Sequence, residues 1–217
     1  MEDKYKMTTE QNLFFAKRNI VDSIWKSSHI EGIDVTFPET QKIFDGGNIA
    51  HLSVDEIQII NNLKHAWLYV LNSIGTENDL NMLKPINSLV GNNLIYKPGE
   101  MRTYEVSIGG TSWKPEIPNV DSINSLLEKQ KSIKCDTERA IKLMCELMRM
   151  QFFSDGNKRT ATLFANKILI ENGRGTIAVP VEKDVEFGQM LIEYYETNNI
   201  EKIANWIYDN ALDGIKQ

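Results

Sequence analysis

Apolar residues recur at spacings of three and four along most of the chain, which predicts a protein built from amphipathic α-helices. The first such stripe runs from residue 9 to about residue 29 and ends just before Gly32, a residue type common after helix C-termini. Pro85 fits a helix only if it lies in the first turn. Further stretches with the same period are residues 53–73, 81–94, 120–130, 136–150, 157–170, 184–196 and 200–212. The pattern predicts an all-α fold.

Residues 102–115 have a different pattern, because apolar and polar residues alternate there on both sides of a Gly-Gly pair. Alternation with a glycine turn at its centre predicts a two-stranded β-hairpin. A lone hairpin is marginally stable in water, so this one needs support from the helices or a partner strand. The connection in residues 33–52 contains a short helix after Phe37-Pro38, with the proline suited to a first helical turn.

A polar turn at residues 154–160 separates two strongly apolar helical stretches and carries the candidate chemistry. Gly156 provides a backbone position without a Cβ atom, and the following helix begins near Asn157. The N–H groups at that helix start, beside Lys158 and Arg159, form an anion site, and phosphate is the usual anion. Asp155 among these cations suggests a carboxylate that holds Mg²⁺ against phosphate oxygens.

Composition narrows the class of protein. The chain has 217 residues, a net charge of −6 and 41% hydrophobic residues, as expected for one domain or one domain with a small extension. An acidic chain is a poor candidate for a nucleic-acid binder. No apolar run approaches the roughly 20 residues that span a bilayer, and the charged first residues do not form a signal peptide. We therefore expect a cytoplasmic protein, away from membranes, with Cys135 and Cys145 reduced.

Two motifs resemble those of a known family. Phe153 and the string Asp155-Gly156-Asn157-Lys158-Arg159 resemble the Fic/Doc signature, His-Pro-Phe-x-Asp-Gly-Asn-Gly/Lys-Arg, and Ser27-x-x-x-Glu31-Gly32 resembles the inhibitory motif of Fic proteins. The resemblance implies an all-α, Fic-type helical domain with one β-hairpin flap at about residues 102–115. It also implies an N-terminal inhibitory helix and its connection in residues 1–52, before a core domain in residues 53–217.

The resemblance also implies an activity, which is the transfer of AMP from ATP to a Ser, Thr or Tyr hydroxyl of a target protein or of the chain itself. The residues at the catalytic positions are Gln151, Asp155, Asn157 and Arg159. Asp155 would hold Mg²⁺ or Mn²⁺, and Gly156, Asn157, Lys158 and Arg159 would bind the nucleotide. The flap would dock the target by strand addition through Val106, Ile108, Gly109, Gly110 and Thr111. A homodimer is compatible with this reading.

Two departures from the family pattern bear on the chemistry. Gln151 stands at the position of the motif histidine, and a carboxamide is no general base, so transfer should be slowed by roughly 10²–10⁴-fold. Thr162 stands at the position of a second arginine, the usual partner of the inhibitory glutamate. We therefore expect Glu31 to lack its salt bridge and its replacement to have a small effect. Two alternatives stay open, a Doc-like phosphotransferase and a nucleotide-binding or partner-binding module without catalysis.

Overall fold

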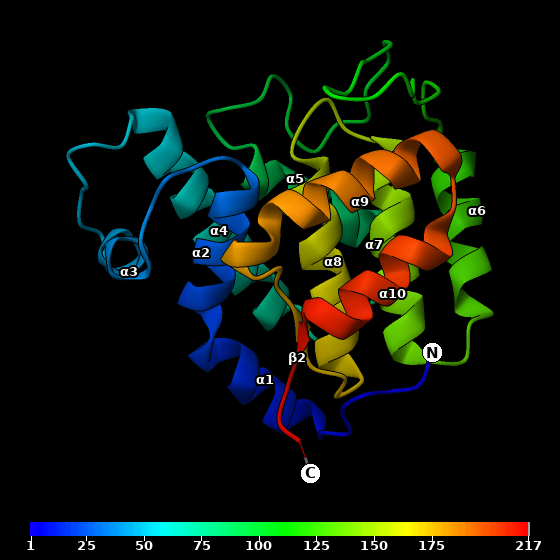
Figure 1. The fold of residues 1–217 in the computed structure, drawn as a ribbon, viewed down its shortest axis with the longest axis horizontal. Helices are drawn as coiled ribbons and strands as arrows, with labels where there is room; N and C mark the ends of the chain where they lie inside the picture. The colour runs from blue at the N-terminus through cyan, green and yellow to red at the C-terminus, as the bar shows by residue number, and fades with distance from the viewer. Residues whose placement is uncertain (217) are drawn as a thin grey trace.

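The computed structural model describes residues 1–216, and in this part of the chain α-helices dominate (Figure 1). The elements are α1 (Thr9–Arg18), α2 (Ile20–Ile30), α3 (Phe37–Phe44), α4 (Val54–Asn72), α5 (Leu80–Val90), α6 (Val120–Lys131), α7 (Asp136–Met150), α8 (Asn157–Glu171), β1 (Thr176–Ile177), the 3₁₀ turn η1 (Val181–Lys183), α9 (Asp184–Thr197), α10 (Ile200–Asn210) and β2 (Leu212–Asp213). The expected all-α fold is confirmed. No helix among the described residues is long and apolar enough to cross a membrane.

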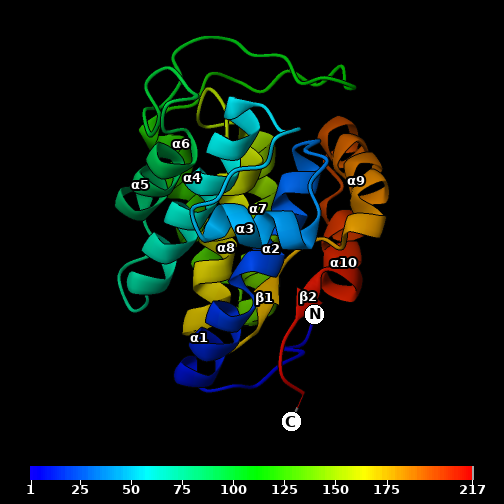
Figure 2. The same cartoon turned by 90° about the vertical axis from the view of Figure 1, so that its left-hand side faces the viewer.

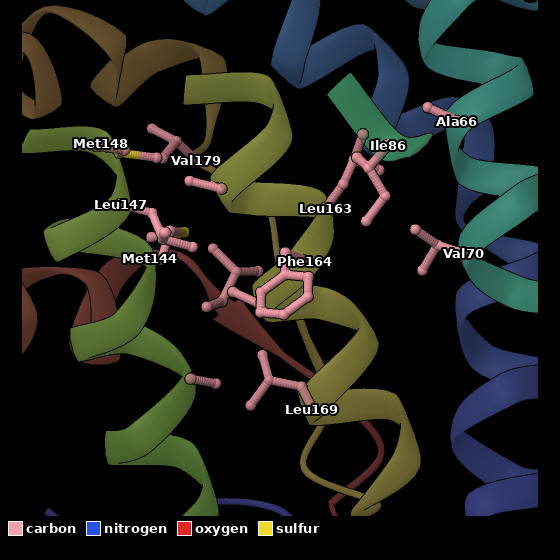
Figure 3. Packing of buried hydrophobic residues seen from close by; sticks show 14 of the residues in the cluster. Ala66, Val70, Ile86, Met144, Leu147, Met148, Leu163, Phe164, Leu169 and Val179 are labelled. Carbon is pink, nitrogen blue, oxygen red and sulfur yellow. The ribbon is translucent and has the colours of Figure 1, made fainter. Parts of the chain in front are cut away.

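Helix α8 is the centre of the core and is buried on nearly every side, so that polar residues such as Asn166 and Lys167 are buried together with its apolar ones. Its Phe164 is fully buried and faces Met144 of α7, while Leu163 lies on the side of Ile86 from α5 (Figure 3). Helix α2 packs against α3 and α4, which carries its C-terminal end towards the start of α8. The expected tight loop between two core helices is thus confirmed, and the loop is residues 151–156.

The structure differs from two helix expectations. The stripe in residues 9–29 forms two helices, because Asn19 leaves the helical conformation (φ −102°, ψ 11°) and its side-chain amide donates to the Phe15 carbonyl at 2.9 Å. Such local side-chain bonds compete with helix continuation. Pro85 lies within α5, beyond the first turn, and that helix ends at Val90 instead of near residue 94. Tertiary packing of α5 against α4 and α8 outweighs the lost backbone hydrogen bond.

The flap, residues 102–115, does not form the expected pair of strands. It crosses one end of the helical bundle as an irregular loop with a turn at Gly109-Gly110 (Figure 2). The antiparallel sheet of the described residues lies elsewhere and consists of β1 and β2. The flap carbonyls of Tyr104 and Pro115 and the Ser112 N–H bond to side chains instead of to each other. The strand-like sequence is therefore held open by side-chain contacts with Arg102 at its base and with Glu196 of α9 at its tip.

A fully buried lysine fastens α8 to the loop before α5. Lys167 Nζ donates to the Thr76 carbonyl at 2.7 Å, to Asn78 Oδ1 at 2.9 Å and to Glu171 Oε2 at 2.7 Å. Asn78 also donates to the other oxygen of Glu171, at 2.8 Å. All three ammonium donors have acceptors, which is the condition under which a buried charge is tolerated.

Lys167→Met should lower the free energy of unfolding by about 3–5 kcal/mol, because it leaves the Glu171 carboxylate, only 13% exposed, without its cation. Lys202→Met is the matched control, since Lys202 pairs with Glu193 at 2.6 Å on the surface. That exposed pair should contribute about 0–1 kcal/mol. Urea unfolding of both variants measures the difference, and equal losses would contradict a buried anchor at Lys167.

Candidate active site

Gln151 ends α7 in the left-handed conformation, with φ 49° and ψ 56°. A non-glycine residue there costs on the order of 1–3 kcal/mol and persists only when its surroundings hold it. The Gln151 side-chain amide donates to the Met148 carbonyl at 2.6 Å and its oxygen accepts from Asn157 Nδ2 at 3.1 Å. Its own carbonyl accepts from Arg102 Nε at 2.5 Å. The position is therefore rigid, but its side chain is a neutral amide.

The phenol beside Gln151 is no base either. Tyr195 donates to the Met148 carbonyl at 3.3 Å, beside Gln151. Burial raises the pKa of the Tyr195 phenol well above its usual range, so the hydroxyl stays protonated. A proton leaving a substrate at this point would find no basic group on either side chain.

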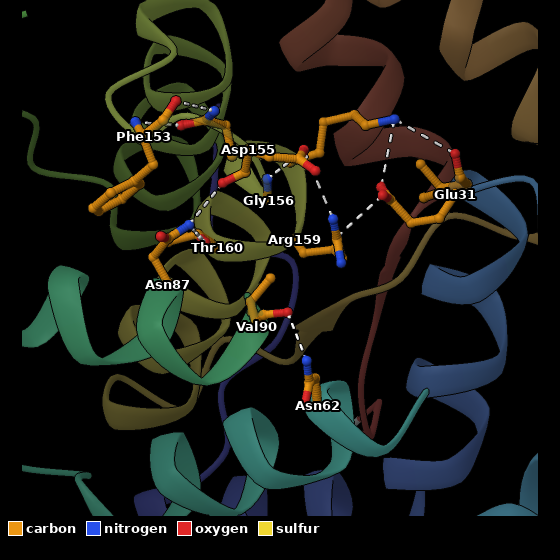
Figure 4. A network of polar contacts seen from close by, with 12 residues as sticks. Glu31, Asn62, Asn87, Val90, Phe153, Asp155, Gly156, Arg159 and Thr160 are labelled. Atoms are coloured by element: carbon orange, nitrogen blue, oxygen red, sulfur yellow. Dashed lines mark hydrogen bonds and ion pairs between the residues drawn. The ribbon is translucent and has the colours of Figure 1, made fainter. Parts of the chain in front are cut away.

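Asn157 and Asn87 fix the shape of the loop. Asn157 Oδ1 accepts from the Phe153 N–H at 2.9 Å, and its Nδ2 donates to the Phe153 carbonyl at 2.9 Å. Asn87 of α5 donates to the Asp155 carbonyl and to Thr160 Oγ1, both at 3.0 Å (Figure 4). The sequence analysis predicted a role for Asn157 and missed Asn87, which is a buried polar residue of α5.

Gly156 is required by both conformation and space. It has φ +73°, and a Cβ atom there would lie 2.8 Å from Val90 Cγ1. It precedes Asn157, the first residue of α8, and no side chain caps this helix. The N–H groups and positive dipole end of α8 therefore face the loop, as the predicted anion site requires.

The charged loop residues differ sharply in exposure. The Arg159 side chain is 6% exposed, whereas Asp155 is 70% exposed and lies 3.8 Å from Arg159 Nη2. Asp155 Oδ1 accepts from the Gly156 N–H at 2.6 Å, which leaves its second oxygen towards solvent. Residues 1–216 contain no group of three or more His, Cys, Asp or Glu side chains that could hold a metal. Asp155 therefore fits Mg²⁺ only in the way this ion often binds, through one carboxylate and substrate phosphates.

Glu31 has a salt bridge, so the expectation that it lacks a partner is wrong. Its Oε2 lies 3.1 Å from Arg159 Nε and its Oε1 lies 3.5 Å from Lys158 Nζ (Figure 4). Arg159, the first arginine of the motif, thus pairs with Glu31 in place of the second arginine, whose position is held by Thr162. This is possible because the C-terminal end of α2 reaches over the start of α8. We call this set, Glu31 with Lys158 and Arg159, the latch.

The charged groups of the latch lie close together, but they are poorly aligned for hydrogen bonds. Glu31 Oε1 and both Nε and Nη1 of Arg159 are buried without a hydrogen-bond partner. Thr162, one turn further along α8, donates its hydroxyl to the Lys158 carbonyl at 3.0 Å. A small cavity of about 20 Å³ lies between Ser27, Glu31, Arg159 and Thr162 and is closed by apolar side chains. The short threonine side chain thus leaves space beside the buried guanidinium.

Two adjoining cavities open in front of the latch and share Lys158, Gly188 and Leu191. The first, about 260 Å³, is lined by Glu31, by the loop at Gln151 and residues 155–157, and by the flap at Ile108 and Gly109. The second, about 220 Å³, extends along α9 to His29. Gln151, residues 155–158, Glu31 and part of the flap therefore meet at one cavity, whereas Arg159 lines the small cavity.

Not every predicted residue reaches this cavity. Ser27 lines only the small cavity behind the latch, and Gly32 lies exposed in the turn after α2. Val106 is half-buried and lines neither of the two adjoining cavities. Thr111 donates to Glu196 Oε1 at 2.5 Å, so its hydroxyl ties the flap to α9 instead of facing the cavity.

The sequence analysis did not single out two residues that fasten the flap. Arg102 is 2% exposed and bonds to carbonyls of the loop and of both limbs of the flap. Glu196 accepts hydrogen bonds from Thr111 and Ser112, and these bonds hold the pKa of its carboxyl below the usual range. Neither residue belongs to a motif, so only the fold identifies them.

The helical fold and its loop define a domain of the Fic type. Residues 79–169, fewer than half of the chain, match the sequence model described as the Fic/DOC family, so this part of the chain is a Fic/DOC-family domain. A comparison with curated proteins gives no match.

Similar solved structures agree on the fold. Residues 134–508 of Fic-1 from C. elegans superpose with a TM-score of 0.78 at 19% identity, over 90% of this chain and 62% of that one. A Fic domain containing signaling protein from Bacteroides thetaiotaomicron gives 0.75 at 18% identity, over 94% and 87%. A Fic family protein from Desulfovibrio desulfuricans gives 0.71 at 18% identity, over 93% and 66%. At such identities the likeness establishes the fold alone.

A double-mutant cycle should separate the two cations of the latch. We expect Glu31→Gln and Arg159→Met to couple by about 1–3 kcal/mol in the free energy of unfolding, because Arg159 is buried. Lys158 is 37% exposed, so Glu31→Gln and Lys158→Met should couple by only about 0–1 kcal/mol. Urea unfolding of the single and double variants gives both values. Stronger coupling to Lys158 would show that the pair with Arg159 is incidental.

Proposed function

We propose that this protein binds ATP with Mg²⁺ at the start of α8 and transfers AMP slowly to a hydroxyl of a target protein or of the chain itself. The observation that carries the proposal is the uncapped helix start beside a buried guanidinium, at the end of a cavity that the flap borders. Such a site suits phosphate, because N–H groups and a planar guanidinium both match phosphate oxygens. Family membership through residues 79–169 supports nucleotide transfer in general.

Each residue then has a distinct task in the proposed reaction. The N–H groups of the first turn of α8, with Lys158 and Arg159, would hold the phosphates and stabilise the charge that develops during transfer. Asp155 would hold Mg²⁺, which supplies Lewis-acid stabilisation of the phosphate oxygens. The target hydroxyl would attack the α-phosphorus, and the bond to the bridging oxygen would break to release pyrophosphate. The proton of the attacking hydroxyl would pass to water, since Gln151 cannot accept it.

One observation favours phosphotransfer as the second candidate. The loop reads Gly156-Asn157-Lys158-Arg159, and Thr162 follows where AMP-transferring relatives carry an arginine, as in the Doc-like sequences that this string resembles. If the nucleotide binds in the opposite direction, the γ-phosphorus reaches the loop and is transferred instead. The latch favours AMP transfer, because an inhibitory glutamate on a preceding helix is typical of that group.

Gln151→His should increase label transfer by roughly 10²-fold or more, because it restores a base at a position already held in place. Incubation with α-labelled and γ-labelled ATP and Mg²⁺ distinguishes the reactions: α-label on protein indicates AMP transfer, and γ-label alone indicates phosphorylation. Gln151→Asn is the matched control, since it keeps an amide and should stay slow. Absence of both labels from a folded variant that still binds ATP would leave the third alternative, a binding module.

Glu31→Gln should tighten ATP binding about tenfold or more, which corresponds to about 1.4 kcal/mol. The change keeps the side-chain shape and removes the negative charge that now occupies the cations needed by phosphate. Asp22→Asn on the same helix is the control, because Asp22 pairs with Lys26 at 2.7 Å. Calorimetric titration with ATP measures both affinities. Equal affinity in Glu31→Gln and the unaltered protein would mean that the latch does not compete with nucleotide.

A further inference from the structure

Arg102 connects the flap to the loop through its whole guanidinium group. Its Nε donates to the Gln151 carbonyl at 2.5 Å, and its Nη1 donates to the Tyr104 carbonyl at 2.7 Å. Its Nη2 donates to the carbonyls of Glu116 at 2.5 Å and Pro115 at 3.4 Å. The Arg102 backbone N–H also donates to the Phe152 carbonyl at 3.1 Å. One side chain therefore joins the loop, the first limb of the flap and the segment that ends its second limb.

This arrangement is unusual for a buried arginine. The residue is 2% exposed, yet no carboxylate of residues 1–216 lies within salt-bridge distance of it. Burial lowers the pKa of the Arg102 guanidinium from its usual value, and the hydrogen-bond partners of this buried charge are backbone carbonyls. A planar fork with five donors can satisfy carbonyls from separate segments, and a lysine ammonium cannot reproduce that geometry.

These contacts matter because neither the flap nor the backbone at Gln151 is kept in its conformation by regular secondary structure. The flap has no cross-strand ladder, so its limbs depend on outside bonds at the base and at the tip. Gln151 has a left-handed backbone, which also depends on its surroundings. Arg102 bonds to both at once, whereas Glu196 bonds only to the tip of the flap.

We infer that Arg102 is a positioning residue that holds the target-docking flap and the side chain at position 151 in one frame. This inference rests on the proposed function for its meaning, because it assigns the flap to the target and position 151 to proton transfer. Arg102 lines neither of the two adjoining cavities in front of the latch. It acts on the alignment of a docked hydroxyl with the loop and leaves nucleotide binding unchanged.

Arg102→Lys tests this in the full chain, with Arg139→Lys as the matched control, because Arg139 pairs with Asp136 at 2.6 Å away from the flap. Chymotrypsin is one probe, since Tyr104 in the flap is 52% exposed and Tyr96, outside it, is 81% exposed. Arg102 donates a hydrogen bond to the Tyr104 carbonyl, so loss of that bond should expose this peptide bond to the protease. We expect the rate of cleavage after Tyr104, relative to cleavage after Tyr96, to rise at least tenfold in Arg102→Lys only.

The side-chain amide signals in nuclear magnetic resonance spectra are the second probe. The Gln151 amide signal should move in Arg102→Lys, whereas the Asn166 amide should not. Asn166 is fully buried and bonds to the carbonyls of Thr162 and Ile177. ATP affinity, measured by calorimetry, should stay within twofold. A merely structural arginine would instead move the Asn166 signal, weaken ATP binding and accelerate both cleavages together.

The inference is overturned by an unchanged cleavage ratio, by an unmoved Gln151 signal, or by loss of ATP affinity in parallel with the cleavage. Failure of the proposed function has a different signature, namely no label from either form of ATP in Gln151→His. The cleavage and amide measurements need no turnover, so they report on Arg102 whatever the labelling shows.

Discussion

The start of α8 concentrates positive charge where water has little access, and this charge needs an anion. Arg159 is 6% exposed and the helix has no side-chain cap, so an empty site would leave both the guanidinium and the helix dipole uncompensated. The chain supplies the anion itself, as Glu31 at the end of α2. The seating of α2 on α3 and α4 therefore determines the electrostatics of a loop more than a hundred residues further along the chain. The buried cation thus already has an anion beside it, and under the proposed function a phosphate would take the place of this carboxylate.

Much of the fold follows from the helical period of the sequence, because the amphipathic stripes are long and several have clear caps. The capping boxes at Thr8 and Ser53 form as their residue types require. The failures come where one side chain or tertiary contact overrides the local pattern. Asn19 breaks a continuous stripe with a bond to its own helix, and Pro85 is kept inside α5 by packing. The flap has strand-like alternation but lacks strand pairing, since side chains take the backbone groups that a ladder needs.

The site was predictable to the extent that it is contiguous in sequence. The loop from Gln151 to Arg159 lies where the motif indicates, and the structure brings Glu31 to it. The choice of partner for Glu31 was not predictable, because it depends on the reach of α2 and on the short side chain of Thr162. Asn87 and Arg102 were also beyond prediction. Each is an ordinary polar residue whose importance comes from carbonyls that the fold brings together.

A flap without its own ladder also has a consequence for the lifetime of complexes. Under the proposed function, a segment that adds to the flap would compete with Arg102 and Glu196 for some of its backbone groups, and the lost bonds would be subtracted from the binding free energy. The backbone would still supply hydrogen bonds that do not depend on the partner's side chains. A docking surface of this kind would favour encounters that are brief and tolerant of sequence, so that selectivity would come from where a proposed target presents its hydroxyl group more than from how tightly the target is held.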